Sequence, residues 1–225
     1  SSMKQTSIER YLGISREDTY TGKDLIHIYQ RYVAKPNEPE EHLLLLHNHD
    51  DLLGMPQLSV ILNYTMFFEH MTITNLTITK EEHTLHLEWE HTLASCLPRR
   101  LAISKDGIYL NADGQHASLW VPISERTLKH YFADYKNYYY LPQEDMAIHK
   151  HVATYVEPEH RVKATKATCY VKQHTSFIPC YLPDSFDCFR EDSCNKQAYQ
   201  TVQSLSDASP ALQQATVLAI LKQYI

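Results

Sequence analysis

The first third of the chain carries apolar residues at helical spacing. Helices are expected over residues 6–13, 21–33, 40–53 and 56–64. Gly13 and Gly54 are placed to end the first and third of these helices, and Pro56 can open the fourth. Thr21, followed three residues later by Asp24, is typical of a capping box. The N-terminal region is therefore predicted to be helical.

The period of the pattern changes to two near residue 72. Strands are predicted over residues 71–79, 84–90, 101–104, 107–110 and 117–122, and a hairpin over 166–179. A helix is favoured from about Pro142, and residues 195–225 are helical in pattern with a break at Ser209-Pro210. The amphipathic stretch 211–225 is expected to dock on its own domain, with a partner-binding helix as the alternative.

These elements predict an α+β architecture in two parts. Residues 1–69 form the helical part, and residues 70–225 form a β-rich accessory domain closed by C-terminal helices. Ser1-Ser2 ahead of Met3 indicates that the chain is a piece of a longer protein.

Composition narrows the function classes. The chain has 225 residues, with 21 Lys plus Arg against 27 Asp plus Glu and a net charge of −6, so any nucleic-acid site must be a local patch. No apolar run is long enough to span a membrane, and the N-terminus lacks the apolar core of a signal peptide. Five cysteines without a CxxC pair fit a reducing compartment, so a cytoplasmic location is expected.

The segment His47-Asn48-His49-Asp50-Asp51 is the first candidate for chemistry. On a helix, His47 and Asp51 lie one turn apart on the same face. A histidine and a carboxylate placed together can bind a divalent metal and orient or deprotonate water. The alternative, which spacing alone favours, is a polar edge on an otherwise buried helix.

Residues 5–69, which include LLLLHNHDDLLGMPQL, resemble the end of a ribonuclease-H-like domain, most closely the YprB-like branch of the DEDD (DnaQ-like) exonuclease superfamily. The last motif of that superfamily is a His or Tyr followed four residues later by Asp, and His47 with Asp51 matches the His form. The resemblance implies a 3′–5′ exonuclease-like hydrolase in which Asp51 is a ligand of a Mg²⁺ or Mn²⁺ pair and His47 activates the attacking water.

The chain departs from the family pattern upstream of His47. Such a nuclease also needs an Asp-x-Glu pair and a second Asp before its last motif, but only 46 residues precede His47 and no Asp-x-Glu occurs among them. Glu88-Trp89-Glu90 comes after the motif, and alternating exposed glutamates of a strand explain it better. This chain alone is therefore expected to be inactive, to hold no metal, and to self-associate through its truncated N-terminal helices.

A tyrosine-rich stretch with nearby cations is the second candidate. Aromatic side chains interleaved with cations hold single-stranded nucleic acid, and the candidate binding residues are Lys136, Tyr138, Tyr139, Tyr140, Arg161, Lys163 and Lys166. The alternative is that these tyrosines fill a β-rich core. Two functions therefore remain: the C-terminal portion of a metal-dependent exonuclease that binds nucleic acid, or a non-catalytic scaffold or protein-interaction module.

Overall fold

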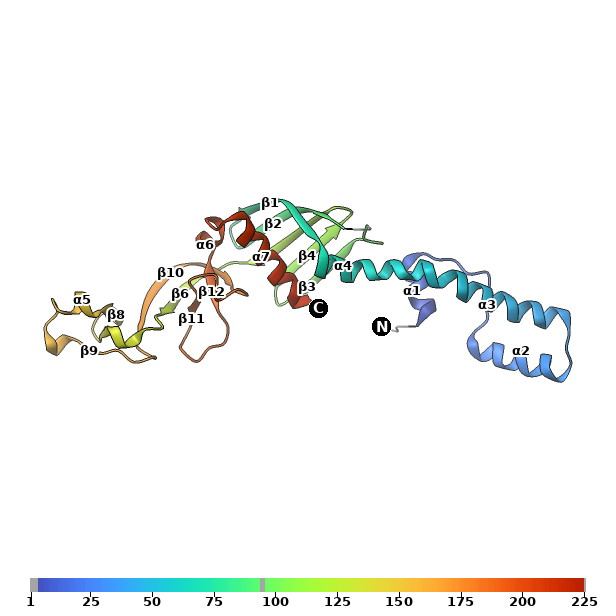
Figure 1. Ribbon diagram of the computed structural model, residues 1–225, viewed down its shortest axis with the longest axis horizontal. Coiled ribbons are helices and arrows are strands. Elements are labelled where there is room, and N and C mark those ends of the chain that lie inside the picture. Colours follow the sequence, from blue (N-terminus) through green and yellow to red (C-terminus); the bar gives the residue numbers. More distant parts are fainter. Residues whose placement is uncertain (1–3, 94–95, 225) are drawn as a thin grey trace. The chain divides into compact units, whose positions relative to one another are not determined.

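The structure is a computed structural model that describes residues 4–93 and 96–224. It is α+β, with N-terminal helices followed by a β-rich region and C-terminal helices, which confirms the predicted fold class (Figure 1). The chain forms two compact units: Ser1–Met71 with Leu93–Arg100, called the helical unit, and Thr72–Thr92 with Leu101–Ile225, called the β unit. No helix among the described residues combines the length and apolarity that a membrane crossing requires.

The helical unit consists of helices joined by short loops. These are α1 (Gln5–Leu12), α2 (Gly22–Ala34), α3 (Glu38–Leu58), the 3-10 turn η1 (Ser59–Leu62) and α4 (Asn63–His70). Gly13 ends α1 with φ of 78°, a left-handed conformation that glycine adopts without a steric penalty. The predicted capping box is confirmed, because the Thr21 side chain accepts from the backbone N–H of Asp24 while the Asp24 carboxylate accepts from that of Thr21.

The prediction that Gly54 ends the third helix was wrong, as was the separate helix from Pro56. Helix α3 continues through both residues to Leu58. A Cβ atom at position 54 would lie 2.9 Å from Oε1 of Glu9 on α1, so the glycine allows a close approach of another helix. Gly54 is therefore needed for packing against α1 and does not end the helix. The spacing of residues along the chain does not reveal this requirement.

The first part of the β unit is a five-stranded antiparallel sheet in the order β1-β2-β5-β4-β3. Its strands are β1 (Thr72–Lys80), β2 (Thr84–Thr92), β3 (Leu101–Lys105), β4 (Ile108–Asp113) and β5 (His116–Pro122), which confirms the alternating pattern. Helices α6 (Val202–Ser206) and α7 (Pro210–Leu221) follow at the C-terminal end, before η4 (Lys222–Tyr224). Helix α7 docks within its own unit, as expected: Gln214 donates to the Ile73 carbonyl, and Val217 and Ile220 are fully buried.

Four further strands close into a small barrel in the order β10-β12-β11-β6. They are β6 (Ser124–Tyr131), β10 (Tyr170–Pro179), β11 (Phe189–Arg190) and β12 (Tyr199–Thr201). Leu128, Phe177 and Phe189 form the buried core of the barrel. The hairpin predicted over residues 166–179 was wrong, because β10 is one strand that pairs with β6 from Tyr170 to Phe177. Residues 199–201 are likewise a strand where helix was predicted.

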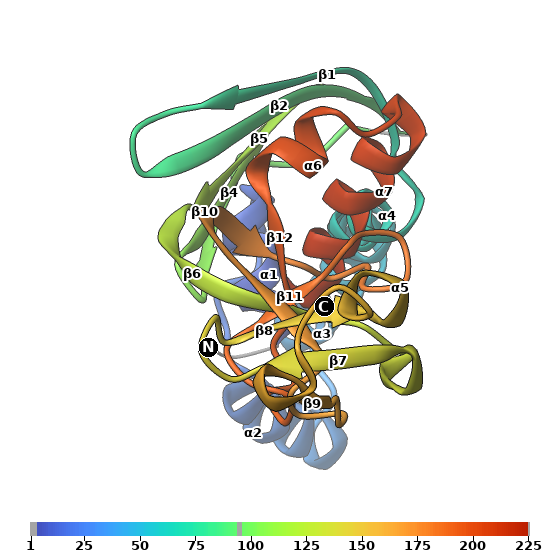
Figure 2. The ribbon, with the colours of Figure 1, turned by 90° about the vertical axis from the view of Figure 1, so that its left-hand side faces the viewer.

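A three-stranded sheet, β8-β7-β9, completes the β unit (Figure 2). This region holds η2 (Tyr135–Asn137), β7 (Tyr138–Leu141), β8 (Met146–His149), α5 (Lys150–Ala153), η3 (Pro158–His160) and β9 (Val162–Lys163). The helix predicted from Pro142 was wrong: β7 and β8 form a hairpin, and only the four residues of α5 are helical. Asp145 has φ of 51° in the turn of this hairpin.

The carboxylate of Asp145 ties this hairpin to strand β10. Oδ1 accepts from the hydroxyl groups of Tyr140 (2.5 Å) and Tyr170, and Oδ2 accepts from Nζ of Lys172. The bond from Lys172 and those from the two tyrosines hold the pKa of Asp145 well below its ordinary value. The ionised carboxylate of Asp145 therefore holds the hairpin against β10, and protonation of this group would weaken the attachment.

Acidification is expected to loosen the β7–β8 hairpin. Because the folded-state pKa of Asp145 is depressed, its contribution is fully present above the unfolded-state pKa of about 3.9 and is lost as the pH falls below it. Hydrogen exchange of the hairpin amides, compared at pH of about 5 and about 2, measures this change. In Asp145→Asn the difference between the two pH values should shrink. An unchanged acid response in that variant would contradict the assignment.

Candidate functional site

His47 and Asp51 lie one turn apart on α3, and the imidazole of His47 stands between two carboxylates. Its Nε2 is 3.3 Å from Oδ2 of Asp51, and its Nδ1 is 2.5 Å from Oδ2 of Asp18. Asp18 comes from the loop between α1 and α2, and its side chain is only 2% exposed, compared with 39% for that of Asp51. The ring is thus oriented from its buried side, and its other nitrogen faces the more exposed carboxylate.

A second aspartate of the motif holds the loop that carries Asp18. Oδ2 of Asp50 accepts the backbone N–H groups of Glu17 at 2.9 Å and Asp18 at 2.8 Å. These bonds, mainly the one from the N–H of Asp18, keep the pKa of Asp50 below its ordinary value. Oδ1 of Asp18 accepts the N–H of Tyr20, which fixes the rotation of that carboxylate. Asp50 therefore positions the residue that orients His47.

Arg16 connects Asp51 to a buried glutamate on α1. One guanidinium nitrogen donates to Oδ1 of Asp51 at 2.5 Å, and the other lies 3.0 Å from Oε2 of Glu9, whose side chain is 2% exposed. Gln5 also donates to Glu9, at 2.8 Å. Burial opposes the charge of Arg16, but the bonds to Asp51 and Glu9 outweigh it and raise its pKa. The guanidinium thus balances two carboxylates that would otherwise repel.

A pocket of about 530 Å³ opens beside these residues within the helical unit. Its lining combines the side chains of the motif with the N-terminus of α2: Lys4, Gln5, Thr6, Arg16, Asp18, Thr19, Tyr20, Thr21, Gly22, His47 and Asp51. Carboxylates, an imidazole and a guanidinium meet around one cavity. That arrangement can bind a polar ligand and move a proton through His47.

The described residues of this pocket do not fit a pair of divalent cations. Two such ions need several carboxylate oxygens within reach, but Arg16 already neutralises Asp51. Among the described residues, the one group of three candidate ligand atoms within 4.8 Å of one another is the exposed set Glu157, Glu159 and His160, which belongs to the β unit.

The tyrosines of the second candidate divide between the two faces of the three-stranded sheet. Tyr138 and Tyr140 pack on a small core of Ala147, Ala164 and Cys169. Tyr138 also stacks on Phe132, with ring centroids 4.6 Å apart and planes 10° apart. Tyr138 and Tyr140 therefore fill a small core, which is the alternative given above for the tyrosine-rich stretch.

Tyr139 lies on the opposite face, where two cations accompany it. It pairs with Lys163 of β9, and the guanidinium of Arg161 lies 5.1 Å from the centre of its ring. Arg161 is held in place by a hydrogen bond to the Ala153 carbonyl. We call Tyr139, Arg161 and Lys163 the Tyr139 surface. The remaining candidates, Lys136 in η2 and Lys166 in the loop before β10, are exposed and lie outside these pairings.

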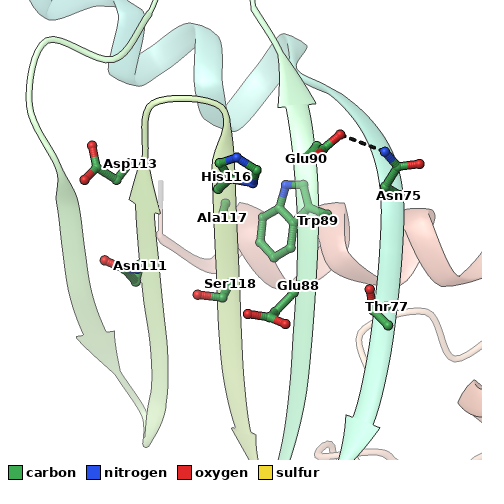
Figure 3. Close-up of a pocket in the computed structure, with 10 residues that line it drawn as sticks. All are labelled: Asn75, Thr77, Glu88, Trp89, Glu90, Asn111, Asp113, His116, Ala117 and Ser118. Carbon is green, nitrogen blue, oxygen red and sulfur yellow. Dashed lines mark hydrogen bonds between the residues drawn. The ribbon is translucent and has the colours of Figure 1, made fainter.

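A second pocket, of about 450 Å³, lies on the exposed face of the five-stranded sheet (Figure 3). Two rows of polar side chains cross neighbouring strands there, Thr77–Glu88–Ser118–Asn111 and Glu90–His116–Asp113. Asn75 donates to Glu90 at 2.7 Å at the edge of the pocket. Glu88 and Glu90 are exposed and Trp89 is 3% exposed, so the alternation expected for this strand is confirmed.

Sequence reasoning found His47 and Asp51 but missed three residues that hold them. Arg16 and Asp18 lie in the loop between the first two predicted helices, and Glu9 is one position of the first of them. The partners of Arg16 and Asp18 on α3 lie about 30 residues further along the chain, so no local pattern marks this pairing.

Comparisons with known proteins bear on the helical unit. Residues 1–63 match a family model described as the RNase_H superfamily. No curated protein and no solved structure matches the chain. The matched residues contain the whole of the His47 network, and they support an RNase H-like relationship for this part of the chain.

Proposed function

We propose that this chain is a portion of a metal-dependent nucleic-acid exonuclease, in which the helical unit supplies the last part of the nuclease site and the β unit binds the strand. The observation that carries the proposal is the coincidence of the family match with the His47 pocket. The residues that match the RNase_H superfamily are those that hold an imidazole between Asp18 and Asp51 beside a cavity.

His47 has the chemical role of a proton acceptor in this proposal. Asp18 fixes the ring through Nδ1, so that Nε2, on the side of Asp51, is the nitrogen that would exchange a proton with water or a substrate hydroxyl. Asp51 contributes negative charge to the same cavity. Mg²⁺ or Mn²⁺ in the complete protein would require further carboxylates from outside this chain, and we propose that the chain alone does not turn over substrate.

The Tyr139 surface provides what a single strand requires. An exposed base stacks on an aromatic ring, and phosphates pair with Arg or Lys. The β unit offers this combination although the net charge of the chain is negative.

Self-association of the helical unit is supported by exposed apolar side chains on one face of α2, namely Ile26, Tyr29 and Val33.

Binding of labelled single-stranded DNA and RNA, followed by fluorescence anisotropy at two salt concentrations, tests the strand-binding part. Affinity is expected to fall as salt rises, because phosphate contacts release bound cations. Tyr139→Ala should weaken binding by roughly 5- to 160-fold, from the loss of about 1–3 kcal/mol of stacking. Arg161→Ala and Lys163→Ala should each reduce the salt dependence.

The matched control is Lys196→Ala, which removes one exposed lysine from the loop between β11 and β12. It should bind as the unchanged chain does. If no binding occurs even at low salt, the scaffold interpretation would replace the strand-binding one. If Lys196→Ala and Lys163→Ala weaken binding equally, the Tyr139 surface would not be the binding site.

A further inference from the structure

Two cysteines of the barrel are brought together by strands that share one neighbour. Cys180 directly follows β10, and its N–H donates to the Ala198 carbonyl at 2.9 Å. Cys188 directly precedes β11. Strands β10 and β11 both pair with β12, where Tyr199 is the partner of Pro179 and also of Phe189. The backbone on each side of the cysteine pair is therefore fixed by the barrel.

The two thiol groups are in direct contact. Sγ of Cys188 donates to Sγ of Cys180 across 3.2 Å. A disulfide bond is about 2.05 Å long, so the sulfur atoms need to approach by only about 1.2 Å, which a small side-chain rotation can supply. Cys180 is 5% exposed and Cys188 is half-buried, so Cys188 is the sulfur that a small molecule reaches first.

The surroundings favour a thiolate in this pair. The hydrogen bond from Cys188, helped by the Leu182 N–H and the charge of Arg190, lowers the pKa of Cys180 despite its burial. Cys188, as the donor, has a raised pKa. The pair thus shares one proton readily, and a thiolate is the form that attacks sulfur.

We propose that Cys180 and Cys188 form a reversible disulfide, with a small-molecule disulfide as the oxidant. Cys180 first loses its proton to solvent, and its thiolate takes the proton of Cys188 as the Cys188 sulfur attacks one sulfur of the external disulfide, whose S–S bond breaks and releases one thiolate. Cys180 then gives this proton to solvent, attacks the sulfur of Cys188 in the mixed disulfide and expels the second thiolate. The protein loses two protons and two electrons, and the external disulfide gains them as two thiols.

The bond would fix a loop that forms part of a pocket. Residues 181–187 connect the two cysteines, and four of them line a cavity of about 390 Å³, together with residues of α6, α7 and the turn between them. The full lining is Asp184, Ser185, Phe186, Asp187, Ser204, Ala208 and Leu212. Closing the loop with a disulfide would restrain one wall of this pocket, so the shape of the pocket would respond to thiol oxidation.

Equilibration of the chain with defined ratios of reduced to oxidised glutathione tests the proposal. After an acid quench, free thiols are alkylated in denaturant, and the masses of the tryptic peptides are measured by mass spectrometry. Residues 173–190 form one tryptic peptide that contains both cysteines, so the disulfide lowers its mass by two hydrogen atoms and blocks two alkylations. Within this peptide the number of alkylated thiols is expected to fall from two to none, with no glutathione mass added, as the buffer becomes oxidising, and to recover with dithiothreitol.

Cys194→Ser, which removes an exposed cysteine of the next loop, is the matched control and should show the same loss of two thiols. Cys188→Ser and Cys180→Ala should abolish it, and circular dichroism verifies that each variant is folded. A peptide 173–190 that stays reduced in the most oxidising buffer, or that stops at a glutathione adduct on Cys188, would overturn the proposal. So would protection of the thiols that requires added Zn²⁺ and disappears with a chelator.

Discussion

Replacing Arg16 with methionine is expected to destabilise the helical unit by about 3–5 kcal/mol. The substitution removes the guanidinium but leaves Glu9, whose side chain is 2% exposed, as a buried and uncompensated charge. It also frees Asp51, which accepts from the same guanidinium at 2.5 Å. Loss of one partner of a buried ion pair costs more than the pair contributes, because the remaining charge keeps its desolvation penalty.

Urea unfolding measured by far-UV circular dichroism and by hydrogen exchange of α1 and α3 reports this loss. Tryptophan fluorescence does not follow it, since both tryptophans lie in strands of the β unit. The matched control is Arg31→Met, which breaks an ion pair to Glu40 whose arginine is 64% exposed, and it should cost less than about 1 kcal/mol. Adding Glu9→Gln to Arg16→Met should restore most of the stability. Equal and small losses in both arginine variants would show that Glu9 is not buried as described.

In a chain extended upstream to include an Asp-x-Glu pair, His47→Ala is expected to slow nucleic-acid cleavage by about 10²- to 10⁴-fold. That range is typical for the loss of a side chain that transfers a proton in the transition state. Asp51→Asn should also impair cleavage, since it removes negative charge from the same pocket without changing its shape. Cleavage of a labelled oligonucleotide with Mg²⁺ or Mn²⁺ measures both effects.

The neighbouring histidine of the motif provides the control for this experiment. His49 has a side chain that is 63% exposed and lies outside the contacts of His47, so His49→Ala should leave cleavage unchanged. Circular dichroism must show that all variants keep their helices. Full activity of both His47→Ala and Asp51→Asn would remove the site assignment. Turnover by the present chain, abolished by Asp51→Ala, would instead show that it needs no upstream carboxylates.

Two features whose sequence signals lie within a few residues were predicted correctly, the capping box of the second helix and the strands around Trp89. Thr21 and Asp24 form a capping box because both halves of the signal lie within one turn. The strands around Trp89 follow from alternation, since one face of that sheet is buried and the other is exposed. In both cases the information that determines the structure lies within a few residues.

The elements determined by distant partners were not predicted. Position 54 requires a glycine because it packs against Glu9, which lies 45 positions earlier in the chain, and β10 is one continuous strand because it pairs with β6 over eight residues. The site shows the same division: spacing on one helix brings His47 and Asp51 together, but Asp18 reaches His47 from another loop. Burial of a charged side chain such as Glu9 leaves no periodic trace in the sequence.

Strand β10 has a further consequence, because one backbone connects two of the proposed sites. Its first residues, Tyr170 and Lys172, hold Asp145 in the hairpin that carries Tyr139, and the strand ends next to Cys180. Ten residues in extended conformation span about 33 Å. If oxidation of the cysteine pair alters the affinity of the Tyr139 surface for a strand, thermodynamic reciprocity requires that a bound strand shift the thiol–disulfide equilibrium by the same factor. The β unit would then be a redox-linked binding module, in which strand β10 connects the cysteine pair to the Tyr139 surface.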